Sequence, residues 1–120
     1  MANSRLQNYL RTYRRRLGLS QADVAMLLGT APGTKVSRYE NFSRIPQAPT
    51  IFALEVIFKQ PARELFAGTY DEIREAVQER ARTISNDLLG AQAVGDKETL
   101  RKVQVLRAIV EPPQNPKSLQ

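Results

Sequence analysis

Residues 19–41 read LSQADVAMLLGTAPGTKVSRYEN, and this stretch decides the fold of the chain. Ser20, with Asp23 three residues later, predicts a capped helix start. Gly29 is suited to end that helix, because glycine readily adopts positive φ. A second short helix follows the turn and runs to Asn41. Small residues near the turn let the two helices cross steeply, so the stretch predicts a helix-turn-helix of the kind that binds DNA.

The sequence of this stretch resembles the phage repressor and Cro-like (XRE) family of helix-turn-helix proteins. The resemblance covers about residues 6–66, and it implies an all-α fold: a five-helix repressor-like domain that binds duplex DNA. One departure is a turn between Gly29 and Ser37 that is one residue longer than usual, with Pro32-Gly33 in place of a polar pair. The resemblance is carried by the order and spacing of Gln21, Ala25, Gly29, Val36, Ser37, Arg38, Glu40, Asn41 and Pro46.

Positive charge is concentrated in the first part of the chain. Residues 1–47 contain eight basic and two acidic side chains, whereas residues 48–120 contain ten of each. The whole formal charge of +6 therefore belongs to the helix-turn-helix part. Clustered lysine and arginine bind polyanions by releasing counterions from phosphates, which favours a nucleic-acid partner.

The second helix of the motif, Thr34–Asn41, has one apolar side. Val36 and Tyr39 are three residues apart and should face inward, with Phe42 following them. The opposite side would then read base edges in the major groove. Arg38 is the strongest candidate, because its guanidinium can bind guanine O6 and N7 together. The predicted base-contacting residues are Thr34, Lys35, Ser37 and Arg38.

Further roles are implied by the resemblance alone. Arg14 and Glu40 match a family ion pair that orients the second helix of the motif. Phe42 stands where the family usually has glycine, so it either covers the core or takes a left-handed backbone conformation. The residues expected to contact DNA phosphates are Gln21, Asn41, Ser43, Arg44 and Arg15.

The remaining helices of residues 1–68 are read from apolar spacing. The first is predicted over residues 4–17, with Leu6, Leu10, Tyr13 and Leu17 as one stripe. Another starts at Pro49 and ends before Pro61, and its nearly continuous apolar sequence predicts the most buried helix. Residues 62–66 form a last short helix, which Gly68 ends.

Two amphipathic helices are predicted over residues 69–110. Thr69 and Glu72 suggest a capping box that starts the first, and Asp96 starts the second. Neither can bury its apolar stripe alone. We expect this region to form a homodimer on a pseudo-palindromic operator, and an intramolecular hairpin in a monomer is the alternative. Residues 111–120 are polar and proline-rich, which predicts a disordered tail.

The composition argues against catalysis. The chain has no histidine and no cysteine, so imidazole bases, thiolate nucleophiles and the usual zinc sites are excluded. We expect neither an enzyme nor a bound cofactor or metal. No apolar run is long enough to cross a membrane, which predicts a cytoplasmic protein. The main hypothesis is a transcriptional regulator, most simply a repressor of its own operator. The alternative is an antitoxin that binds a toxin through residues 69–110.

Overall fold

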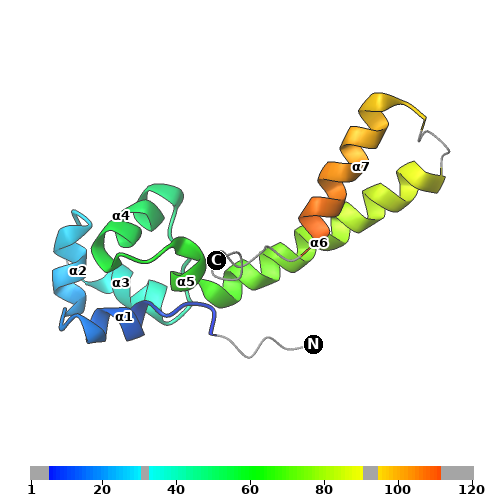
Figure 1. The fold of residues 1–120 in the computed structure, drawn as a ribbon. Coiled ribbons are helices and arrows are strands. Elements are labelled where there is room, and N and C mark those ends of the chain that lie inside the picture. Colours follow the sequence, from blue (N-terminus) through cyan, green and yellow to red (C-terminus); the bar gives the residue numbers. More distant parts are fainter. Residues whose placement is uncertain (1–5, 31–32, 91–94, 112–120) are drawn as a thin grey trace. The chain divides into compact units, whose positions relative to one another are not determined.

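The computed structural model describes residues 6–30, 33–90 and 95–111. Within these residues the chain is all-α, as predicted, with seven helices and no strand (Figure 1). The chain divides into two units, Met1–Glu72 and Ile73–Gln120. The helices are α1 (Leu10–Arg16), α2 (Gln21–Leu27), α3 (Thr34–Glu40), α4 (Ala48–Phe58), α5 (Ala62–Leu65), α6 (Ala67–Gly90) and α7 (Lys97–Val110).

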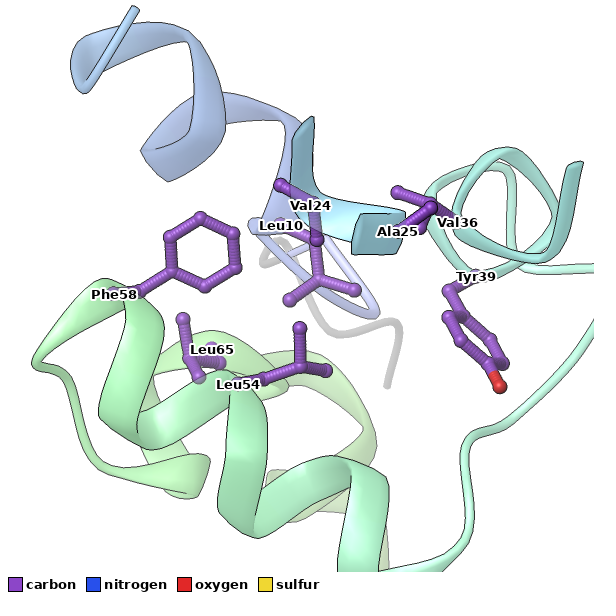
Figure 2. Packing of buried hydrophobic residues seen from close by; sticks show 8 residues of the cluster. All are labelled: Leu10, Val24, Ala25, Val36, Tyr39, Leu54, Phe58 and Leu65. Carbon is purple, nitrogen blue, oxygen red and sulfur yellow. The ribbon is translucent and has the colours of Figure 1, made fainter. Parts of the chain in front are cut away.

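One buried cluster joins the first five helices (Figure 2). Each helix contributes only one or two side chains, because each is short and has a single inward side. Leu65 of α5 is fully buried, and Tyr13, Leu19, Leu28, Ile57 and Phe66 pack around the cluster. The cluster consists of Leu10, Val24, Ala25, Val36, Tyr39, Leu54, Phe58 and Leu65.

The start of α2 and the two ends of the turn that follows it are described, whereas residues 31–32, within the turn that was predicted to be one residue longer than usual, lie outside the described residues. The Ser20 hydroxyl accepts the N–H of Asp23, and the Asp23 carboxylate accepts the N–H of Ser20, which completes a capping box. Gly29 has φ of +78° just after α2. Gly33, the N-cap of α3, lies so close to Gln21 that a Cβ on residue 33 would be 3.1 Å from the Gln21 backbone. A small residue here lets the two helices start close together.

Helix α1 is shorter than predicted. It begins at Leu10 rather than near residue 4, and the predicted stripe is incomplete because Leu6 and Leu17 are exposed. Its first described turn is fixed by Asn8, whose side-chain oxygen accepts the N–H of Leu10 at 3.1 Å. Because residues 6–9 precede the helix, their backbone groups can bond to other parts of the chain.

That backbone bonds to the start of α6, where a second prediction was wrong. α6 begins at Ala67, so Gly68 lies in its first turn rather than ending a helix, and Thr69 lies inside the helix rather than at its start. The Gly68 N–H donates to the Leu6 carbonyl at 2.8 Å, and the Tyr9 N–H donates to the Leu65 carbonyl at 2.7 Å. A Cβ on residue 68 would collide with the Leu6 carbonyl, so close docking requires glycine.

Helix α4 is not the most buried helix, which corrects another prediction. Leu54 and Phe58 face the core, but Phe52 and Val56 are 64% and 72% exposed. The helix covers one side of a small core, so only one side of it packs inward. Its apolar sequence runs all the way round the helix, and periodicity therefore could not identify the buried side.

The second unit contains the rest of α6 and α7. Ala81 and Ser85 of α6 and Val103 and Leu106 of α7 are its buried residues among those described. The predicted start of α7 is present, because the Asp96 carboxylate accepts the N–H of Glu98 at 3.2 Å.

The second-unit helices are also joined by a direct hydrogen bond, from the Gln78 amide to the Ile109 carbonyl at 3.2 Å. The predicted tail lies outside the described residues except for Glu111, the C-cap of α7. In the part of the chain that the structure describes, no helix has the length and apolar character needed to cross a membrane.

Candidate nucleic-acid interface

Helix α3 presents a polar side to solvent and an apolar side to the core. Val36 and Tyr39 are buried, as their spacing predicts. Three of the four predicted base-contacting residues, Thr34, Lys35 and Arg38, are exposed, while Ser37 is half-buried. Thr34 and Arg38 are four residues apart and so lie one above the other. The helix therefore carries a hydroxyl and a guanidinium on its outer face.

Glu40, the last residue of α3, forms a buried ion pair. Its side chain is 1% exposed, and the predicted pair with Arg14 is present: Nε to Oε2 is 2.6 Å and Nη2 to Oε1 is 3.1 Å. Arg14 also donates to the Leu19 carbonyl at 2.9 Å. A guanidinium fork bound to both carboxylate oxygens fixes orientation as well as distance. α1, the turn before α2, and α3 are thus joined through one side chain.

This contact sets the ionisation of both partners. Burial alone would raise the pKa of Glu40, but hydrogen bonds from Arg14 and Gln21 outweigh it and hold that pKa below its ordinary value. The same hydrogen bond to Glu40 raises the pKa of Arg14. Both groups are therefore charged at neutral pH.

Gln21 belongs to this network, which the sequence did not indicate. It was predicted to contact a DNA phosphate, and in the structure its amide Nε2 donates to Glu40 Oε1 at 3.1 Å. One of its two amide hydrogens is therefore used inside the protein. Arg11 also approaches the same oxygen, at 3.5 Å, while its side chain remains 55% exposed. Arg11 lies three residues before Arg14 on the same side of α1, and this spacing could have indicated that Arg11 also reaches Glu40.

The loop after α3 folds back onto the last turn of that helix. Asn41 is the C-cap, and its side-chain oxygen accepts the N–H of Ser43 at 3.1 Å. The Ser43 hydroxyl donates to the Arg38 carbonyl at 3.3 Å, and the Arg44 N–H donates to the same carbonyl at 3.2 Å. These bonds hold the predicted phosphate contacts Asn41, Ser43 and Arg44 beside the exposed side of α3. Arg15, the remaining one, is exposed on α1.

Phe42 resolves the alternatives left by the sequence. Its φ is +70°, so it takes the left-handed conformation of the glycine that the family usually has there. Its side chain is 42% exposed, and the expectation that it follows Val36 and Tyr39 inward was wrong. Phe42 is accordingly not part of the buried cluster.

Asn8 is a second residue that sequence reasoning missed. It is buried, and its amide Nδ2 donates to the Tyr39 carbonyl at 2.8 Å while its oxygen accepts the N–H of Leu10, the first residue of α1. A single side chain therefore ties the start of α1 to the last turn of α3. An asparagine often bonds a backbone N–H two residues later, but nothing in the sequence indicated that the amide of Asn8 reaches Tyr39.

Comparison with known proteins agrees with this geometry. A family described as "Helix-turn-helix domain" matches residues 5–64, which is half of the chain. No curated protein and no solved structure gives a significant match. The matched range contains α1 to α4 and most of α5, so it includes every residue that was predicted to contact DNA.

Proposed function

The chain belongs to the helix-turn-helix domain family and is in general terms a DNA-binding regulator, and from this premise we propose that it is a sequence-specific repressor. It binds duplex operator DNA with α3 in the major groove and performs no catalysis. In the cell it acts in the cytoplasm, on the nucleoid.

The observation that carries the proposal is the outer face of α3. Thr34 and Arg38 are exposed one turn apart, while the other side of the same helix is fixed by Val36, Tyr39 and Glu40. A rigidly held helix loses little entropy on binding, so its exposed side chains are suited to reading base edges. The excess positive charge of residues 1–47 supplies the attraction to phosphates.

The test begins with selection of binding sites from a random duplex library. Arg38→Ala should weaken binding to the selected site and relax the preference at one base pair, by about 1–3 kcal/mol for a bidentate contact. Arg63→Ala is a matched control, because Arg63 is also exposed but lies on α5. If Arg38→Ala lowered affinity equally for every sequence in the library, base reading by Arg38 would be wrong.

We further propose that the protein acts as a homodimer through its C-terminal unit. Ile73, Val77 and Ile84 fall on one side of α6, and each is more than 40% exposed. A second copy would cover this stripe and would place two α3 helices on a pseudo-palindromic operator. Exposed apolar side chains in a row favour such an interface over a solvated surface.

Light scattering tests the dimer directly. The protein should have twice the 13.5 kDa mass of one chain, and Val77→Glu should return it to one chain by placing a charge on the stripe. Gln104→Glu is the control, since it adds the same charge at an exposed position of α7. A single-chain mass at every concentration would contradict the dimer. Recovery of a stoichiometric small protein partner would instead favour the antitoxin hypothesis.

A further inference from the structure

The N-terminal segment, residues 6–9, supplies acceptors for the first N–H groups of α6. The first N–H groups of any helix have no acceptor within the helix itself. In α6 the Gly68 N–H donates to the Leu6 carbonyl at 2.8 Å, and the Thr69 N–H donates to the Gln7 carbonyl at 3.3 Å. The backbone of the N-terminal segment therefore takes the place that a capping side chain has in other helices.

The contact between this segment and α6 is closest at Gly68. A Cβ added there would lie 2.7 Å from the Leu6 carbonyl carbon and 2.9 Å from the Gln7 Cα, which is closer than folded proteins allow. The residue at the end of α5, Leu65, is fully buried, and its carbonyl accepts the N–H of Tyr9 at 2.7 Å. Three backbone hydrogen bonds thus hold the segment against the end of α5 and the first turn of α6.

The same segment is bonded to α3. Asn8 is buried, and its amide donates to the carbonyl of Tyr39, in the last turn of α3, at 2.8 Å. The segment is also closed on itself, because the Tyr9 hydroxyl accepts the N–H of Leu6 at 3.2 Å. Four consecutive residues therefore connect the last turn of α3 to the first turn of α6 by hydrogen bonds.

Helix α6 begins in the first unit and continues into the second. It runs as one helix from Ala67 to Gly90, and the boundary between the units falls after Glu72. Each turn of a helix is hydrogen-bonded to the next, so the direction of the first turn sets the direction of the turns that follow. The contact at Gly68 therefore determines the direction in which the chain leaves the helix-turn-helix unit.

We propose that Gly68 and the N-terminal segment set the spacing between the two half-sites that the dimer binds. The inference rests on the proposed function, both on DNA binding by α3 and on the homodimer. In a two-fold dimer each α3 reads one half-site, so the path from α3 to the dimer contact determines how far apart the half-sites lie. Gly68 is a positioning residue on this path, and it is separate from the residues predicted to contact DNA.

A series of duplexes that carry the selected half-sites at different spacings tests the proposal. Each added base pair moves one half-site by about 3.4 Å and turns it by about 35° around the duplex axis. The unmodified protein should bind best at one spacing, and about tenfold more weakly when the spacing changes by two base pairs. Gly68→Ala should reduce this preference to about twofold, because the N-terminal segment no longer fits against α6. Its base preference and its affinity for a single half-site should not change.

Gly90→Ala is the matched control. It makes the same substitution in the same helix, at a position where an added Cβ meets nothing within 4 Å. It should keep the spacing preference of the unmodified protein. Thermal unfolding and light scattering verify that both variants are folded and dimeric.

Tyr9→Phe is a milder second variant. It keeps the ring and removes the hydroxyl that accepts the N–H of Leu6, so it loosens the N-terminal segment without a steric conflict. It should reduce the spacing preference from about tenfold to about fivefold. If Gly68→Ala does not fold, Tyr9→Phe decides the question, and an unchanged preference in Tyr9→Phe would then overturn the proposal.

An unchanged spacing preference in folded, dimeric Gly68→Ala would also overturn the proposal. The same holds if Gly68→Ala weakened binding to a single half-site as much as binding at the best spacing, because the segment would then act on α3 itself. If the unmodified protein bound a single half-site but preferred no spacing, the dimer would fail, and this proposal with it, while DNA binding would stand. If the unmodified protein bound no duplex, the proposed function itself would fail.

Discussion

The helix-turn-helix unit and the C-terminal unit differ in how completely each buries its own apolar surface. The first contains eight buried side chains in one cluster, drawn from five helices. The second has only four described buried residues, and larger apolar side chains such as Ile73, Ile84 and Val105 are exposed. The contrast agrees with the proposal that the second unit, unlike the first, is covered by another protein surface.

The two units also differ in their polar contacts. In the first, Glu40, Arg14 and Asn8 are buried or half-buried and bond across different helices. Such bonds are directional, and leaving one partner buried and unpaired is costly. In the second, polar contacts such as Arg82 to Glu79 and the cap at Asp96 are exposed. Exposed contacts of this kind contribute little to stability.

The largest expected effect comes from Arg14→Ala. This change leaves the Glu40 carboxylate buried without its main partner, and it should lower the free energy of unfolding of the first unit by about 3 kcal/mol. Urea unfolding would measure the loss. Hydrogen exchange should speed up in α3 and remain unchanged in α7.

The double variant Arg14→Met, Glu40→Met sharpens the comparison. It removes both charges and keeps apolar volume, so it should be less destabilised than Arg14→Ala alone. If the double variant were less stable than Arg14→Ala, the attraction between Arg14 and Glu40 would itself stabilise the unit. The cost of Arg14→Ala would then not come from the unpaired charge of Glu40.

A smaller effect is expected from Asn8→Ala, which removes both the bond to the first N–H of α1 and the bond to the Tyr39 carbonyl. The loss should be about 2 kcal/mol, and Asn8→Ser should recover about half of it by keeping an oxygen that can accept the first N–H of α1. Asp96→Ala removes the side-chain cap of α7 and should cost about 0.5–1 kcal/mol, because that site is exposed and makes no cross-helix bond. Equal losses at residues 8 and 96, measured by thermal unfolding, would break the contrast between the units.

The smallest effect is a pH dependence carried by Glu40. Its pKa is lowered in the folded protein, so the folded state binds this proton less readily than the unfolded state, whose pKa is near 4.5. The resulting stability is present above that pH and is lost as pH falls through the lower folded pKa. Unfolding of Glu40→Gln should therefore depend less steeply on pH below 4.5 than that of the unmodified protein. Asp23→Asn should keep the contribution of Glu40. If the free energy of unfolding of all three proteins had the same dependence on pH, the contribution of Glu40 would be refuted.

Much of the geometry of the helix-turn-helix could be predicted from local sequence. The spacing of Val36 and Tyr39 was enough to separate the buried side of α3 from the exposed one, because a helix of known start has only one way to place them. The capping box at Ser20 likewise predicted the first residue of α2 correctly. The Arg14–Glu40 pair came from the family resemblance, since no spacing rule links residues 26 positions apart.

The parts that were missed depend on tertiary placement. The buried side of α4 could not be assigned, because Phe52 and Leu54 are equally apolar and only the position of the core distinguishes them. The reach of Asn8 to Tyr39 and the bond between Leu6 and Gly68 depend on the backbone conformation of residues 6–9. Short-range patterns carry no information on such contacts.

The closeness of Gly68 to the Leu6 carbonyl also offers a criterion for sorting relatives. The family match ends at residue 64, so the domain definition does not include this position. A related chain with alanine or a larger residue aligned to Gly68 must route its opening segment elsewhere, since the two backbones leave no space for a methyl group. The residue aligned to Gly68 would then separate relatives that share this docking of the N-terminal segment from relatives that share only the helix-turn-helix.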